Sequence, residues 1–382
     1  MSKTSLASRL YYGLCCLILF FVAAAASFNG YYDRFHFKEV DNTTTKFSFE
    51  RMMDGTANRP FVYRQLLPTI ANWIDARIPD ATKDRLFSAK THHGDPLKAW
   101  LFNTAVSQSR QYFIRYLVVY VAVFLSAWFS VYAMYLLCKS LGSSAPIAAF
   151  AAVIMILVMP VILSGGGGGQ IYDFPELALL MIVTWMAIKF DWWWMIPVVA
   201  IGAWNKESFL LYMPTLYPLL RLRSSRINAL VGTGSLSLVC AAVYLAIRSH
   251  FQQNPGGTVE LGLMHQITFM LHPLTWSPPE KIYGVLMTEP FNPLALIVLV
   301  WTAWRGWRLL PKAIQRHAQI AAIINVPLYI VFCDAGELRD LSLLFVTLLV
   351  LLAVNLNEWS GNRTGLLREA GAPDKRIEVN AH

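Results

Sequence analysis

The chain is divided into long apolar blocks that carry almost no charge. Its 382 residues are 56% hydrophobic and 14% charged, whereas a soluble domain has about 25% charged residues. Several blocks reach the roughly 18 residues that an α-helix needs to cross ~30 Å of hydrocarbon. A helix pairs its own backbone groups there without water. The sequence therefore predicts an all-α, polytopic transmembrane helical bundle.

Ten apolar segments are predicted to span the membrane. They are residues 11–28, 112–137, 146–163, 174–189, 192–204, 208–220, 227–247, 291–304, 317–333 and 340–356. The first follows Lys3 and Arg9 and resembles a signal peptide, but its length favours an uncleaved first span. The stretch 192–220 fits either two spans or one long kinked segment.

Basic residues in short loops predict the orientation. "RLRSSR", "RGWRLLPKAIQR", Lys139, Lys189 and the tail fall on one side, which the positive-inside rule makes cytoplasmic, together with both termini. Chain 1–382 is then a single transmembrane domain with a first outer loop at 30–111 and a second at 248–290. The tail 357–382 is polar and predicted to be disordered.

The first outer loop is predicted to contain interfacial helices. In "RQLLPTIANWIDARI", Leu67, Ile70, Ile74 and Ile78 recur at helical spacing and polar residues lie off that face, which is typical of an amphipathic helix in the interface plane. A second such stretch is "DPLKAWLFNTA", residues 95–105.

Three carboxylates on the outer side are candidates for acid–base chemistry. Asp33 follows the first span, where it could remove a proton from a hydroxyl nucleophile; an ordinary solvated loop aspartate is the alternative. Asp173 and Glu176 follow Tyr172, itself a candidate substrate-binding residue, in "SGGGGGQIYDFPE". The glycines allow the backbone to pass close to a bulky partner, so this run is interpreted as a pliable wall of a site.

Basic residues on the same side are candidates for binding phosphate. Arg59 and Arg64 bracket aromatic residues in "NRPFVYRQLLP"; they could grip a lipid phosphate or only snorkel to anionic headgroups. "WNKES" holds Lys206 and Glu207, which are costly near hydrocarbon. Neighbouring residues on a helix do not face each other, so each is expected to find its partner elsewhere. "GELRD" adds Glu337 and Arg339.

Other classes of site lack a sequence signal. No P-loop, GxSxG elbow or GxGxxG after a strand occurs. The five cysteines and eight histidines show no metal-ligand spacing, so no metal site is predicted. No cofactor is predicted either, although the sequence leaves open a requirement for a divalent cation. The net charge of +9 is explained by membrane orientation, and no nucleic-acid partner is predicted.

The layout resembles the GT-C superfamily of integral-membrane glycosyltransferases. The resemblance rests on an acidic residue after the first span, an outer loop with interfacial helices, ten spans, and polar outer loops; "RPFVYRQLLP", "WNKES" and "GELRD" resemble motifs of a bacterial membrane-protein branch related to that superfamily. It implies that Asp33 is the base, that Asp173 or Glu176 is a second acidic position, and that Arg64, Lys206 and Arg339 hold the donor phosphate. The chain lacks the large C-terminal soluble domain and the adjacent acidic pair of better-known members.

The resemblance implies an enzyme, a hexosyl- or pentosyltransferase of the bacterial inner membrane that acts on the periplasmic side. Its partners would be a polyprenyl-phosphate sugar donor, a glycan, lipid or protein acceptor, and membrane lipids. A transporter or flippase of a lipid-linked glycan is the main alternative, with the glycine run as an unwound half-helix. An O-antigen polymerase or ligase-like enzyme and a non-catalytic assembly subunit are further alternatives.

Overall fold

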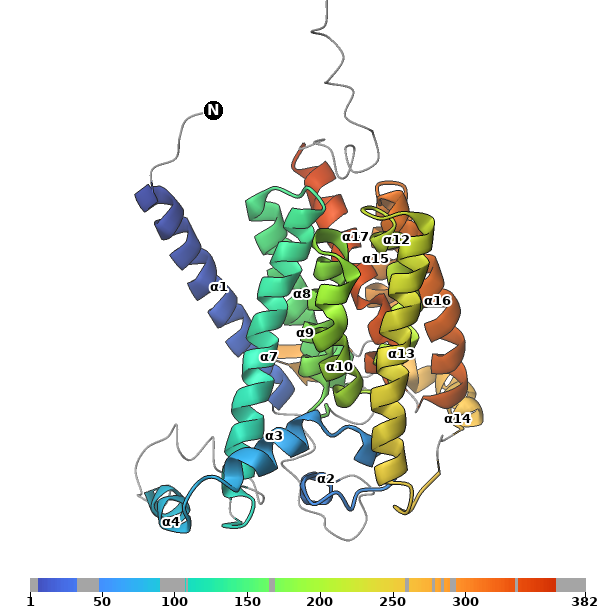
Figure 1. Ribbon diagram of the computed structural model, residues 1–382. Coiled ribbons are helices and arrows are strands. Elements are labelled where there is room, and N and C mark those ends of the chain that lie inside the picture. Colours follow the sequence, from blue (N-terminus) through green and yellow to red (C-terminus); the bar gives the residue numbers. More distant parts are fainter. Residues whose placement is uncertain are drawn as a thin grey trace, which may run out of the picture.

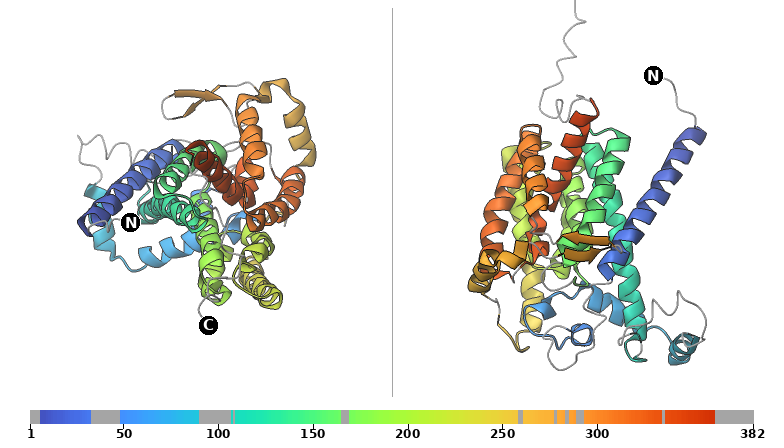
Figure 2. Two further views of the ribbon diagram at one scale, coloured as in Figure 1. Left: turned by 90° about the horizontal axis from the view of Figure 1, so that it is seen from above. Right: turned by 180° about the vertical axis from the view of Figure 1, so that it is seen from behind.

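The computed structural model describes residues 6–32, 48–89, 107, 109–164, 169–257, 261–276, 279–282, 285–288, 293–333 and 336–361. Long helices run side by side through most of this part of the chain (Figure 1; Figure 2). The predicted helical class is confirmed. One short antiparallel hairpin is added to it, β1 (Pro279–Ile282) paired with β2 (Val285–Thr288).

Five helical stretches are long and apolar enough to cross a membrane, in agreement with an integral membrane protein. They are Tyr11–Tyr31 within α1 (Leu6–Tyr32), α7 (Phe113–Ser140), Ala145–Leu163 within α8 (Ala145–Ser164), α13 (Arg226–His250), and Leu338–Trp359, which joins η6 (Leu338–Leu344) to α17 (Phe345–Trp359). The other predicted spans form shorter or less apolar helices, among them α9 (Asp173–Lys189), α15 (Pro293–Trp307) and α16 (Lys312–Phe332). The predicted number of ten spans is therefore not confirmed.

The stretch 192–220 is divided into short pieces. They are η3 (Trp192–Met195), α10 (Ile196–Asn205), α11 (Ser208–Tyr212), η4 (Met213–Leu216) and α12 (Tyr217–Leu220). Pro197, Pro214 and Pro218 lie near the starts of three pieces, where a missing N–H costs least. Lys206, between α10 and α11, is extended (φ −159°, ψ 143°). As a result α10 ends short of the lower ends of α7 and α13 in Figure 1.

The second half of α1 is tied to the bundle. Helix α7 packs against α8 and α9, and α1 lies along α7 and α8. Ser27 Oγ donates a hydrogen bond to the Ile156 carbonyl at 2.7 Å, and the Phe28 ring packs edge-on against Tyr120 and Phe124. These contacts bring the last turn of α1 to the first turn of α9.

Helices of the first loop lie across the end of the bundle where α9 begins (Figure 1). They are α2 (Phe49–Met53), η2 (Phe61–Tyr63), α3 (Leu66–Asp75) and α4 (Asp80–Ala89). The predicted helix is confirmed as α3, but its predicted apolar face was partly wrong. Leu66, Leu67 and Ala71 are buried, where α3 meets α7 and α10, whereas Ile70 is 37% exposed. The second interfacial stretch, 95–105, lies outside the described residues.

The remaining loops differ slightly from their predicted limits. α13 extends to His250, three residues into the predicted second loop, which also contains α14 (Leu263–Leu271), η5 (Pro273–Trp276) and the hairpin. α17 extends to Trp359, so helix replaces the first residues of the predicted tail; residues 362–382 lie outside the description.

Gly202 provides a test of the packing of α10. A Cβ built there would lie 2.2 Å from Phe209 Cε1, whereas one built at Gly234 in α13 meets nothing within 4 Å. We expect Gly202→Ala to destabilise the protein by about 1–3 kcal/mol, the cost of overpacking a close-packed interior. Gly234→Ala should be neutral or stabilising because alanine favours helix by ~1 kcal/mol. Unfolding of the purified protein in detergent measures both, and equal effects would contradict this packing.

Candidate functional site

Eight ionisable side chains form one network at the recessed end of α10. They come from four segments that are distant in the sequence: Arg64, then Asp173 and Glu176, then Lys206 and Glu207, and finally Glu337, Arg339 and Asp340. The network is held between η2, α9, the α10–α11 break and η6. We call it the ion-pair network below.

Lys206 is the central cation of the ion-pair network. Its side chain is buried, and Nζ lies 2.9 Å from Glu176 Oε2 and 3.2 Å from Asp340 Oδ1. The other oxygen of Glu176, Oε1, accepts hydrogen bonds from Ser208 Oγ at 2.5 Å and Ser342 Oγ at 2.7 Å. A buried charge is tolerated only when it is paired and its remaining lone pairs are satisfied, and both conditions are met here.

Arg64 pairs with Glu207 through two parallel contacts. Nη2 lies 2.8 Å from Glu207 Oε1 and Nε lies 3.3 Å from Oε2, which is the bidentate geometry that guanidinium favours. Arg64 also donates to Tyr172 Oη and lies over the Tyr172 ring, 4.2 Å from its centroid. Burial opposes ionisation of Glu207, but Arg64 outweighs it and holds the pKa of that carboxyl below its ordinary value.

The different partners of Lys206 and Glu207 confirm a prediction. These adjacent residues were expected not to pair with each other, and Lys206 contacts Glu176 and Asp340 while Glu207 contacts Arg64. The extended backbone at Lys206 sends the two side chains to different helices.

Arg339 and Asp173 connect the network to the end of α1. Arg339 Nη2 lies 2.5 Å from Glu337 Oε1, and Nη1 lies 3.9 Å from Asp173 Oδ2. The same Asp173 oxygen accepts hydrogen bonds from Gln170 N at 2.7 Å and from Tyr31 Oη at 3.2 Å. Asp173 therefore holds the start of α9 against Tyr31, two residues before Asp33 in the sequence.

The glycine run lies partly within the described residues. Residues 165–168 are outside them, but a Cβ at Gly169 would lie 2.2 Å from Tyr31 Cε2. The expected close passage of backbone past a bulky partner is thus observed at Gly169. It lets Tyr31 donate to the Gln170 carbonyl and to Asp173.

The network contains more acidic than basic groups. Three cations face five carboxylates, so its formal charge is two units negative when all are ionised. Arg64, Lys206 and Arg339 are each already paired, and an incoming phosphate would compete with their carboxylates. Glu207 and Asp340 keep side-chain exposures of 31% and 23%, whereas Asp173 and Glu176 are buried.

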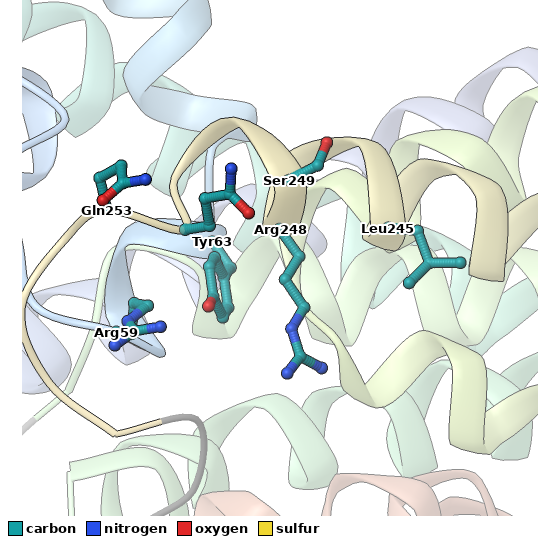
Figure 3. Close-up of a pocket in the computed structure, with 7 residues that line it drawn as sticks. Arg59, Tyr63, Leu245, Arg248, Ser249 and Gln253 are labelled. Carbon is teal, nitrogen blue, oxygen red and sulfur yellow. The ribbon is translucent and has the colours of Figure 1, made fainter.

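The structure gathers most, but not all, of the predicted site residues. Asp33 lies outside the described residues. Arg59 lies apart from the network, in a pocket of ≈ 530 Å³ lined by Arg59, Tyr63, Leu245, Arg248, Ser249, Gln252 and Gln253 (Figure 3). Asp340 of the network, and Ser208 and Ser342, which donate to Glu176, were not predicted from the sequence. Asp340 belongs to the "GELRD" motif itself, which was the available signal.

No metal centre is evident in the part of the chain that the structure describes, where three or more His, Cys, Asp or Glu side chains are nowhere grouped to hold an ion. A second pocket of ≈ 400 Å³, lined by Leu136, Lys139, Ser140, Trp185, Lys189 and Phe190, lies at the far ends of α7 and α9.

Comparisons with protein-family models, with curated proteins and with solved structures gave no match to this chain.

The ion pairs of Lys206 and Arg305 test how much burial adds to the contribution of an ion pair to stability. Both make a 2.9 Å ion pair, but Lys206 is buried whereas Arg305 and Glu358 are each 39% exposed. We expect Lys206→Met to destabilise the protein by about 3–5 kcal/mol, because Glu176 and Asp340 lose their counter-ion. The control Arg305→Met should cost less than about 1 kcal/mol. Denaturant unfolding in detergent measures both, and similar losses would contradict a network stabilised by charge pairing.

Proposed function

We propose that the protein is an integral-membrane glycosyltransferase of the GT-C type. It moves a sugar from a polyprenyl-phosphate-linked donor to a glycan, lipid or protein acceptor. The observation that carries the proposal is the convergence of Asp173, Glu176, Lys206, Glu207 and Arg339 on one ion-pair network. Motifs scattered over separate faces would have argued against a single site.

In this proposal Asp33 acts as the general base. The acceptor hydroxyl gives its proton to the Asp33 carboxylate, and its oxygen forms a bond to the anomeric carbon of the donor. The bond between that carbon and the lipid phosphate oxygen breaks, and polyprenyl phosphate leaves. The nearby contact of Tyr31 with Asp173 supports this role, because it ties the end of α1 to the network.

The acidic excess of the network suits a sugar better than it suits a free anion. Carboxylate oxygens accept hydrogen bonds from hydroxyl groups, and Glu207 and Asp340 are its more exposed members. We assign these two carboxylates to the sugar hydroxyls. The buried Asp173 and Glu176 hold Arg339 and Lys206, whose charges are already balanced. We therefore assign the departing phosphate to Arg59, which lies outside the network.

We further propose that ten segments cross the bacterial inner membrane, with the network facing the periplasm and both termini facing the cytoplasm. Helix α1 begins and α17 ends at the same end of the bundle, opposite α3 (Figure 1). Lys139 and Lys189 lie in the last turns of α7 and α9, at the end away from the network. The positive-inside rule favours this orientation.

Cysteine labelling tests the orientation. In a variant whose five native cysteines are replaced by alanine, Thr56→Cys near α2 should react with a membrane-impermeant maleimide added to intact cells. Arg223→Cys, between α12 and α13, should react only after the membrane is opened. The reverse pattern would invert the proposed topology, and labelling of both sites in intact cells would contradict a common spanning bundle.

Asp33→Asn tests the catalytic role. Loss of a general base costs about 10²–10⁴-fold in rate, so we expect a loss of this size with membrane insertion and thermal stability unchanged. The measurement is polyprenyl phosphate released from a polyprenyl-phosphate sugar by the purified protein with membrane acceptors. Asp80→Asn, which removes an exposed carboxylate of the same loop, is the control.

Unimpaired turnover in Asp33→Asn would remove Asp33 as the base. Glu39→Gln and Asp41→Asn would then identify which neighbouring carboxylate takes its place, and normal turnover in all three would exclude this loop.

One observation favours transport of a lipid-linked glycan as a second candidate. The break at Lys206 separates short helices around buried charges, which is typical of discontinuous helices at transporter binding sites. Reconstituted vesicles separate the two functions. Passage of the lipid-linked glycan across the bilayer without covalent change supports transport, whereas released polyprenyl phosphate supports transfer.

A further inference from the structure

The pocket around Arg59 is electrostatically opposite to the ion-pair network. Its lining contains two arginines, Arg59 and Arg248, and polar groups from Ser249, Gln252 and Gln253, but no acidic side chain. Figure 3 shows Arg59, Tyr63 and Arg248 around one space at the end of α13. We call this the arginine pocket.

Two loops are locked together to build the arginine pocket. Arg59 N donates to the Pro255 carbonyl at 2.8 Å, and Arg59 Nη2 donates to the Gly256 carbonyl at 2.6 Å. Asn254 Nδ2 donates to the carbonyls of Gly55 and Ala57 at 2.8 and 3.0 Å. These bonds fix the chain before η2 to the chain after α13, so the pocket is preformed.

Two buried polar atoms of the pocket residues have no hydrogen-bond partner. They are Arg59 Nε and Tyr63 Oη. Tyr63 is only 3% exposed. Leaving a buried donor unpaired costs about 1–3 kcal/mol. A ligand with acceptor oxygens would satisfy both donors, so these atoms point to an anionic oxygen ligand.

The outer face of α13 leads from the pocket along the bundle. Val231, Leu238 and Leu245 are exposed, and their seven-residue spacing places them on one face of the helix. Leu245 also lines the pocket. A hydrocarbon chain lying on this apolar strip would end at Arg248, one turn of helix beyond Leu245.

We propose that the arginine pocket binds the phosphate group of a membrane lipid whose chain lies along α13. Arg59 and Arg248 pair with the phosphate oxygens, and Tyr63 Oη donates to one of them. Guanidinium groups suit phosphate because of their planar, multiple donors. The inference rests on the proposed function only where it identifies this lipid as the sugar donor, since binding does not require turnover.

The pocket adjoins the network through consecutive residues. Tyr63 faces the arginine pocket while Arg64 pairs with Glu207. The Tyr63 ring also packs edge-on against Tyr244, with centroids 6.1 Å apart. A phosphate at Arg59 and Arg248 would thus lie one residue away in the chain from Arg64, whose partner Glu207 we assign to the sugar.

Lipid binding by the purified full-length protein tests the proposal. The probe is polyprenyl monophosphate in phosphatidylcholine nanodiscs, and the fraction of protein that retains it is measured by native mass spectrometry. We expect Arg248→Gln to weaken retention on the order of tenfold, since a lost charge-assisted hydrogen bond is worth about 1.5–3 kcal/mol. Arg248→Lys should restore part of it, and Tyr63→Phe should weaken it less.

Arg77→Gln is the matched control. Arg77 is an exposed arginine at the same end of the bundle, and its guanidinium lies over the Trp73 ring rather than in the pocket. Equal retention by Arg248→Gln and the wild-type protein would overturn the proposal, as would an equal loss in Arg77→Gln. Should Arg248→Gln fail to fold, Tyr63→Phe and Gln252→Ala carry the same test. Displacement of the probe by millimolar inorganic phosphate would assign the pocket to a soluble phosphate compound and overturn the lipid assignment.

The sugar-transfer assay keeps the two proposals distinguishable. Retention that depends on Arg248 without any sugar transfer supports the pocket and contradicts the proposed function. Normal transfer by Arg248→Gln contradicts the identification of the bound lipid as the sugar donor and leaves the proposed function standing.

Discussion

The buried ammonium group of Lys206 is the constraint on which this end of the bundle depends. Removing a charge from water costs several kcal/mol, and only close counter-ions and hydrogen bonds offset that cost. Glu176 from α9 and Asp340 from η6 supply the negative charge, while Ser208 and Ser342 donate hydrogen bonds to the other oxygen of Glu176. Three distant parts of the chain must therefore meet before Lys206 can be buried.

This requirement explains irregular backbone in a bundle of otherwise long helices. α10 ends at Asn205, Lys206 is extended, and η6 precedes α17. Asn325 of α16 supports η6 by donating to the Asp340 carbonyl at 2.7 Å and accepting from Leu343 N at 3.2 Å. Short helices turn the polar residues inward, and side chains satisfy the backbone groups that regular helix would have paired.

The sequence predicted the helices better than it predicted their partners. Apolar length located α1, α7, α8, α13 and α17, because hydrophobic blocks are a local property. It also predicted that Lys206 and Glu207 have separate partners, although the cause is the extended backbone at Lys206 and not the helix geometry assumed. It failed at Ile70, where the packing of Leu66 and Ala71 decides which face of α3 is buried. Asp340 was missed for a similar reason. In the sequence it is a charged residue next to an apolar segment, as is common at the end of a span, and only the fold brings Lys206 beside it.

The adjacency of Tyr63 and Arg64 has a thermodynamic consequence. Tyr63 borders the arginine pocket and Arg64, the residue after η2, is held by Glu207, so a shift of η2 would move both residues. Two ligands acting on such a shared element influence each other's affinity by equal factors. A ligand bound in the arginine pocket would then change the affinity of the ion-pair network for its own ligand, and the reverse. The three residues of η2 would be the element that couples the two sites.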